Sequence, residues 1–156
     1  MNLAAVRLIV SRVTLGGLLL CATGCSSFHR EWKRAGASPT PPAGIEGRWE
    51  GTWRSDVNQH TGRLRCLITR GTNDLYRARF HAKYRKVIQF SFGYTVPLTV
   101  TERDGAIHFE GAAELGWLAG GRYTYTGRTS LTNFSAGYSC QYDHGVFEMA
   151  RPDSTR

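Results

Sequence analysis

Apolar and polar residues alternate with a period of two along much of the chain from Ile45 onward, and this alternation restricts the fold more than any other feature. It is clearest over residues 76–85, where Tyr, Ala and Phe alternate with Arg, His and Lys. Successive side chains of a β-strand point to opposite faces, so the pattern is typical of strands with one buried face. No helical period is sustained over the same region. The sequence therefore predicts an all-β domain.

Turn residues separate the predicted strands about every 8 to 12 positions, which indicates about eight or nine strands in residues 45–152. Short links force consecutive strands to be antiparallel, and closing such a meander removes its exposed edges. We expect a single antiparallel up-and-down β-barrel, or a flattened barrel or sandwich, with a tail at residues 153–156. Asp104-Gly105 predicts a tight hairpin. Pro97 cannot donate a backbone hydrogen bond and is expected at a bulge or edge, where the barrel is not quite closed.

The N-terminus has the pattern of an export signal. Arg7 and Arg12 are the only charges before a short apolar run, Val13 to Ala22, which small residues follow. The run is too short for a membrane span, which needs about 20 apolar residues. The small residues 22–24 before Cys25 resemble the lipobox of bacterial lipoproteins, which implies removal of residues 1–24 and lipidation of Cys25. The alternative is an ordinary secretory signal with an incidental cysteine.

A lipidated Cys25 predicts an envelope protein tethered to a membrane. Each buried methylene of an acyl chain contributes about 0.8 kcal/mol, so two or three chains hold a protein on a bilayer. Ser26, after the cysteine, implies by the same resemblance the outer membrane of a Gram-negative cell, with the domain facing the periplasm. Two of the 20 basic residues lie in the signal, so the 132 remaining residues keep a net charge of +6. This excess favours acidic partners or phospholipid headgroups.

Residues 25–44 differ in composition from the predicted domain. Their prolines, with Ser, Thr, Ala and Gly, predict an extended spacer between the lipidated N-terminus and the barrel. Phe28 and Trp32 stand among basic residues, a composition suited to a membrane surface. A disordered stalk with incidental aromatics is the alternative.

Cys66 and Cys140 remain once the signal is removed and Cys25 is acylated. One pair of cysteines in an oxidising compartment predicts a disulfide. It would close a loop of about 75 residues and contribute a little over 4 kcal/mol in the chain-entropy description. Two buried thiols that never meet are the alternative, since bridged Cα atoms must lie within about 7 Å.

The first predicted strand contains Gly47-Arg48-Trp49. This triplet resembles the Gly-x-Trp motif at the start of lipocalin and avidin (calycin) barrels. The resemblance implies that Trp49 caps the barrel floor and packs under an arginine just after the last strand, where Arg151 stands. The second lipocalin motif, Thr-Asp-Tyr, and a C-terminal helix are missing from this chain.

The inward face of the predicted barrel mixes bulky rings with small residues. Barrels of about eight strands are either filled by side chains or hold one small ligand, and buried tyrosines need partners for their hydroxyls. We therefore expect a pocket for a small apolar or amphipathic ligand, with a packed core as the alternative. Trp117, in a glycine-flanked loop, is expected as a lid, a membrane-dipping tip or a plug. The candidate ligand-binding residues are Trp53, Tyr76, Phe80, Tyr84, Trp117, Tyr123 and Tyr138.

Basic residues cluster on the outward face of two neighbouring predicted strands. They suit phosphate-bearing polymers or headgroups and indicate an alternative function, a non-enzymatic structural or assembly lipoprotein that docks on lipid or another envelope component. An ordinary solvated face is the simpler interpretation, and an exported lipoprotein is not expected to bind nucleic acid. The candidates are Arg63, Arg65, Arg77, Arg79, Lys83 and Arg85.

The sequence offers little support for catalysis. The five histidines show no metal-ligand spacing. Asp143 and His144 near Ser139 are triad residue types, but neighbours on a strand and a turn point to different sides. We therefore expect a binding protein with no catalytic residues, metal or cofactor.

Overall fold

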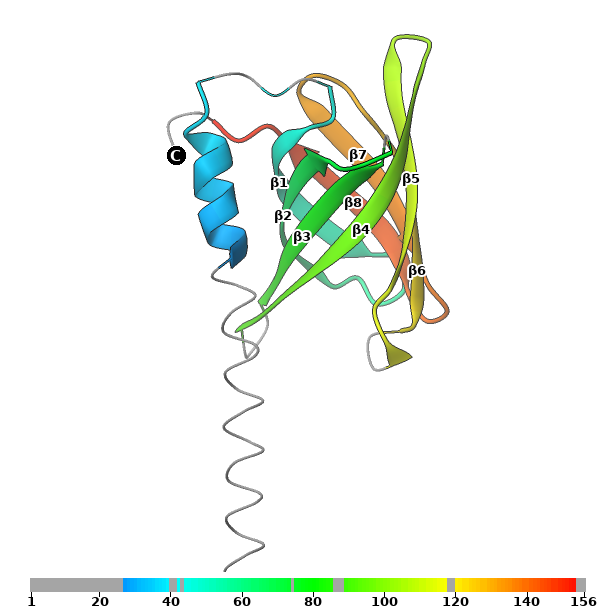
Figure 1. Cartoon of the computed structure of the whole chain (residues 1–156). Coiled ribbons are helices and arrows are strands. Elements are labelled where there is room, and N and C mark those ends of the chain that lie inside the picture. Colours follow the sequence, from blue (N-terminus) through cyan, green and yellow to red (C-terminus); the bar gives the residue numbers. More distant parts are fainter. Residues whose placement is uncertain are drawn as a thin grey trace, which may run out of the picture.

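The chain folds as a closed barrel of eight antiparallel strands in a computed structural model (Figure 1). The structure describes residues 27–39, 42, 44–73, 75–85, 89–117 and 120–153; of residues 84, 85, 89 and 90 it describes only the backbone. The predicted signal and Cys25 lie outside the described residues. The strands are β1 (Gly47–Ser55), β2 (Thr61–Arg70), β3 (Tyr76–Arg85), β4 (Gln89–Arg103), β5 (Ala106–Glu114), β6 (Arg122–Thr129), β7 (Asn133–Ser139) and β8 (His144–Ala150).

Each strand pairs with its neighbours in the sequence, as expected of an up-and-down barrel. β8 then pairs with β1, from Glu50↔Ala150 to Ser55↔Gly145, and closes the barrel. The hairpin at Asp104-Gly105 is confirmed: both residues have positive φ, 52° and 72°, which suits the tightest turn between right-twisted strands. The predicted all-β barrel is therefore confirmed, with eight strands.

β4 changes partners along its length. Its first part, from Gln89 to Leu98, pairs with β3, whereas the described register with β5 runs only from Leu98↔Gly111 to Arg103↔Ala106. Pro97 is the first residue beyond that ladder. A proline costs little at this place because an edge position needs no donor. β4 thus passes from β3 to β5 at Leu98, the residue that pairs with both neighbours.

One end of the barrel, called the floor below, is closed by Trp49 and Arg151. Trp49 is fully buried, and its indole N–H donates to the carbonyl of Ile45 at 2.8 Å. The Arg151 guanidinium lies 3.7 Å from the centre of the Trp49 ring. It also donates to the carbonyls of Gly44, at 2.7 Å, and Glu46. The contact that the Gly-x-Trp resemblance implied is present.

Gly47 is required by this closure. Its φ is +96°, a conformation that other residues rarely adopt. An added Cβ would clash with the Pro42 ring, at 2.6 and 2.7 Å, and would lie 3.0 Å from the Arg151 guanidinium, so a larger residue would strain this turn.

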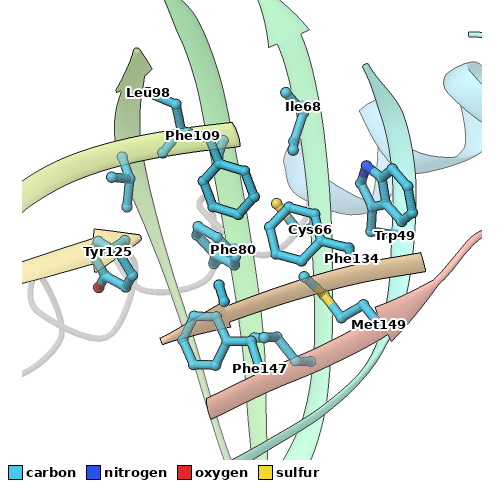
Figure 2. Close-up of a cluster of buried hydrophobic side chains, with 14 of the residues drawn as sticks. Trp49, Cys66, Ile68, Phe80, Leu98, Phe109, Tyr125, Phe134, Phe147 and Met149 are labelled. Carbon is cyan, nitrogen blue, oxygen red and sulfur yellow. The ribbon is translucent and has the colours of Figure 1, made fainter. Parts of the chain in front are cut away.

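Alternate residues of all eight strands form the core, which fills the floor half of the barrel and continues into the wall of its other half (Figure 2). Phe134 lies between Trp49, at 5.5 Å between ring centroids, and Phe109, at 4.7 Å. Cys66 is fully buried among these side chains, and burial raises the pKa of its thiol well above the ordinary value.

The predicted Cys66–Cys140 disulfide is wrong: within the described chain both thiols are free. In the barrel register Cys66 lies opposite Trp49 of the floor, whereas Cys140 follows β7 at the other end. The strand pairing therefore holds the two cysteines at different heights.

The extended spacer predicted for residues 25–44 is also wrong over residues 27–36, which form a helix on the outside of the barrel (Figure 1). Phe28 and Trp32, four residues apart and so on one helix face, are buried against Leu67 of β2. Glu31 pairs with Arg79 of β3 at 2.5 Å. Apolar burial thus places these two aromatic residues on the protein instead of on a membrane surface. No helix of the described residues is long and apolar enough to cross a membrane.

His81 of β3 lies beneath this helix and is only 3% exposed. Its ring stacks on Phe28 with centroids 5.1 Å apart, and neither ring nitrogen has a hydrogen-bond partner among the described residues. Burial, together with the positive neighbours His29, Lys83 and Arg65, lowers its pKa below the ordinary 6.5. The docked helix therefore favours the neutral imidazole.

Replacing Arg151 with lysine should lower the free energy of unfolding by about 1–3 kcal/mol, because an ammonium cannot stack flat on Trp49 and donate to two carbonyls as the guanidinium does. Chemical denaturation measures this loss. Arg103→Lys, at an exposed strand end, is the matched control and should change stability by less than about 0.5 kcal/mol. Equal losses in both variants would contradict a special role for Arg151.

Acidification should weaken the folded state through His81. Its pKa is lower in the folded than in the unfolded protein, so below about pH 6.5 the unfolded chain takes up the proton more readily and stability falls. Melting temperatures between pH 8 and 5 measure the effect. His81→Phe, which keeps the ring stack, should flatten this part of the curve, and His108→Gln at an exposed site should not. A curve unchanged in His81→Phe would exclude this assignment.

Candidate cavity at the barrel mouth

A cavity of about 490 Å³ lies at the end of the barrel opposite the floor. This end, called the mouth below, is where β1, β3, β5 and β7 end (Figure 1). The lining residues are Trp53, Leu64, Ala82, Phe92, Gly93, Tyr94, Leu115, Tyr123, Tyr125, Tyr138, Asp143 and Phe147. The barrel is thus packed at the floor and hollow at the mouth.

Aromatic rings from β4, β6, β7 and β8 form most of the cavity wall. Tyr125 stacks with Tyr94 and Tyr123, with centroids 6.2 and 6.3 Å apart. Tyr138 faces Phe147 at 5.0 Å and Tyr123 at 6.1 Å. Alternation along each strand directs these side chains inward, and the small residues Ala82 and Gly93 leave space opposite them.

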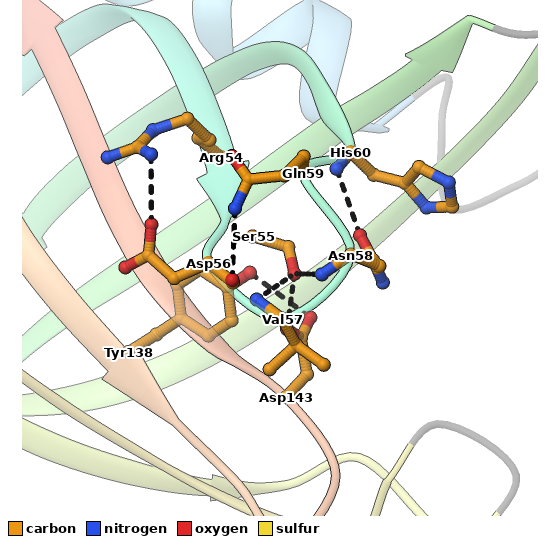
Figure 3. A network of polar contacts seen from close by, with 9 residues as sticks. All are labelled: Arg54, Ser55, Asp56, Val57, Asn58, Gln59, His60, Tyr138 and Asp143. Atoms are coloured by element: carbon orange, nitrogen blue, oxygen red, sulfur yellow. Dashed lines mark hydrogen bonds and ion pairs between the residues drawn. The ribbon is translucent and has the colours of Figure 1, made fainter.

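A polar network ties two turns together at the mouth (Figure 3). The buried Ser55 hydroxyl donates to Asp143 Oδ1 at 2.6 Å and accepts the backbone N–H groups of Val57 and Asn58, both at 3.2 Å. The Tyr138 hydroxyl donates to Asp143 Oδ2 at 3.1 Å. Asp143 therefore joins the β1–β2 turn to the end of β7, beside the cavity.

The tyrosine hydroxyls of the cavity stay protonated at physiological pH. Burial raises the pKa of Tyr125 to about 12, and it raises the pKa of Tyr94, Tyr123 and Tyr138 as well. The buried Tyr125 hydroxyl has no hydrogen-bond partner among the described residues. The nearby Tyr94 hydroxyl lowers the pKa of Tyr125 slightly against the larger effect of burial. The cavity thus offers neutral hydroxyls to a guest.

Three of the predicted ligand-binding residues, Trp53, Tyr123 and Tyr138, line the cavity. Phe80 is instead buried in the core below it, and Tyr76 belongs to the floor half of β3, where it pairs with Leu98. Trp117 is 84% exposed and does not line the cavity, so its role as a lid stays a prediction. The side chain of Tyr84 is outside the described residues.

Several lining residues were not predicted from the sequence. Tyr94 shares a strand face with Val96, and Tyr125 shares one with Tyr123, so alternation could have identified both. Asp143 was considered only as a triad residue type, and the closure of β8 on β1 is what brings it to Ser55.

The predicted basic face is partly covered by protein. Arg65 lies 5.1 Å from the centre of the Trp32 ring and pairs with Glu50, which Arg63 also contacts. Arg79 pairs with Glu31 of the helix, while Arg77 is exposed. Lys83 is half-buried, and Arg85 is described only by its backbone. Docking through this face stays a prediction.

The triad residue types at the mouth do not form a triad. Asp143 contacts Ser55 and Tyr138, whereas Ser139 and His144 are paired, exposed strand residues. Among the residues that the structure describes, no three His, Cys, Asp or Glu side chains form a group that could hold a metal ion. The cavity has a mostly apolar wall and one polar corner at Asp143.

No family model, curated protein or solved structure matches this chain. The fold and the cavity define its class: an eight-stranded antiparallel up-and-down β-barrel, closed at the floor and hollow at the mouth.

Replacing Ser55 with alanine should lower the free energy of unfolding by about 1–3 kcal/mol, because a buried hydroxyl that serves Asp143 and two turn N–H groups is lost. Thermal or chemical denaturation measures the change. In Ser135→Ala, the control, an exposed hydroxyl bond to Glu148 is lost, and the effect should stay below about 0.5 kcal/mol. A neutral Ser55→Ala would show that the network does not hold the mouth together.

Proposed function

We propose that this chain is a lipid-anchored envelope protein of the calycin type that binds a small apolar or amphipathic molecule in the cavity at its mouth. The observation that carries the proposal is the cavity itself. Its volume of about 490 Å³ falls in the range of about 300–1,000 Å³ typical of small-molecule sites, and aromatic rings form most of its wall.

The floor contact supports the calycin part of the proposal. Trp49 under Arg151 is the arrangement that the Gly-x-Trp resemblance implies. A closed floor and an open mouth are what a barrel needs to hold one guest and exchange it from one side.

The course of the N-terminal helix supports an anchor near the mouth. The helix ends beside the floor, where Gly36 lies against Arg48, and its first turn lies further along the barrel towards the mouth (Figure 1). Ser27, in that first turn, accepts a hydrogen bond from Arg79. Cys25 precedes Ser27 by two residues, which span about 7 Å at most. A lipid on Cys25, at the outer membrane facing the periplasm, would hold the mouth towards the bilayer. Amphipathic molecules are concentrated there.

Native mass spectrometry tests the binding function. The experiment uses a variant that begins at residue 26 and therefore keeps every described helix and strand. This variant is exported and purified without detergent. We expect an adduct that is lost on denaturation and that extraction identifies. A bare mass, even after incubation with an extract of envelope lipids, would contradict the proposal.

Filling the cavity should abolish retention of the adduct. Ala82→Phe adds a ring to the wall at a buried lining position, and about 1–3 kcal/mol of overpacking is the expected cost in stability. Ala150→Phe, at an exposed position of β8, is the control and should keep the adduct. Tyr123→Ala removes a wall ring without adding volume and should also weaken retention of the adduct, which decides the question if Ala82→Phe does not fold. An adduct that survives unchanged in both Ala82→Phe and Tyr123→Ala would lie outside the cavity.

A further inference from the structure

The charge of the cavity is negative and comes from one group. Asp143 is the only charged side chain among its described lining residues. Two basic residues of the mouth rim are engaged elsewhere: Arg54 pairs with Asp56 at 3.0 Å, and Arg122 lies 3.7 Å from Glu114. A guest in the cavity therefore meets a carboxylate that no described cation neutralises inside it.

Aromatic rings surround this carboxylate. Tyr138 bonds it directly, and Tyr123 lies near enough that the Asp143 charge adds to burial in raising the pKa of its hydroxyl. Phe147 faces Tyr138 on the cavity side. The face of an aromatic ring carries negative electrostatic potential and attracts cations within about 6 Å of its centre. The carboxylate and the rings thus favour the same sign of charge.

The carboxylate can accept further hydrogen bonds. Each of its oxygens has two lone pairs, and each receives one described bond, from Ser55 to Oδ1 and from Tyr138 to Oδ2. These bonds hold the carboxylate in a fixed orientation beside the cavity and leave acceptor capacity on both oxygens. An anionic headgroup at this place would be repelled at close range in a partly buried site.

We propose, on the basis of the cavity function above, that the guest is an amphipathic organic cation. Its ammonium group lies beside Asp143 and against the rings of Tyr123 and Tyr138. Its apolar body extends deeper, against Phe147, Tyr94 and Ala82. The polar corner selects the charge of the head, and the aromatic wall binds the rest by burial of apolar surface.

Three probes with the same ten-carbon chain test the sign of the charge: decylammonium, 1-decanol and decyl sulfate. Each is titrated calorimetrically, far below the concentration at which it aggregates, into the protein that begins at residue 26. We expect the cation to bind about tenfold or more tightly than the alcohol and the sulfate. Ala82→Phe should abolish binding of the cation, which places it in the cavity.

Asp143→Asn locates the selectivity. The amide has the shape of the carboxylate and can still bond Ser55 and Tyr138, so the variant should fold, which its melting curve checks. We expect it to lose about tenfold or more in affinity for the cation and to bind the alcohol as before. Asp56→Asn, an exposed carboxylate on the neighbouring turn that does not line the cavity, is the matched control and should leave all three affinities unchanged.

The outcomes separate this proposal from the function on which it depends. Equal or tighter binding of the alcohol or the sulfate by the unaltered protein overturns the cation proposal and leaves a general amphiphile site. This comparison needs no variant, so a failure of Asp143→Asn to fold does not prevent a decision. Loss of selectivity in Asp56→Asn as well would overturn the role of Asp143. No binding of any probe, or binding that Ala82→Phe does not affect, overturns both the cation proposal and the cavity function.

Discussion

The packing of Arg151 on Trp49 is the contact on which the rest of the barrel depends. It joins the segment before β1 to the segment after β8, because the same guanidinium bonds the carbonyls of Gly44 and Glu46. A cation removed from water needs several partners to offset its desolvation, and here an aromatic face and two carbonyls supply them. Burial lowers the pKa of Arg151 only to about 10, so the group stays charged at neutral pH.

Closure at the floor decides where a guest can lie. The rings of Trp49, Phe134 and Phe109, from facing strands, pack against one another and fill that half of the barrel. Towards the mouth aromatic rings stand around the wall while Ala82 and Gly93 are small, so a cavity remains between them. The Ser55–Asp143–Tyr138 network ties the turns at its rim together.

The helix at residues 27–36 is folded structure, not a spacer, between the proposed anchor and the barrel. Phe28 and Trp32 are buried on β2 and β3, and Glu31 pairs with Arg79, so this segment is part of the folded domain. A tether that begins at a docked helix restricts how the barrel can turn relative to a membrane. His81 is buried beneath the helix, and burial lowers its pKa below the ordinary value.

The sequence by itself determined the strands, because a period of two leaves each strand only one face to bury. It also identified the hairpin at Asp104-Gly105 and the floor pair Trp49 and Arg151. Which inward residues pack and which line a cavity depended on the register of all eight strands, so Phe80 belongs to the core and Tyr94 to the cavity wall. The helix, the separation of Cys66 from Cys140 and the meeting of Asp143 with Ser55 were likewise decided only by the tertiary structure. The physical reason is that local periodicity fixes the face on which a side chain lies, whereas its height in the barrel and its partners follow from strand pairing across distant parts of the chain.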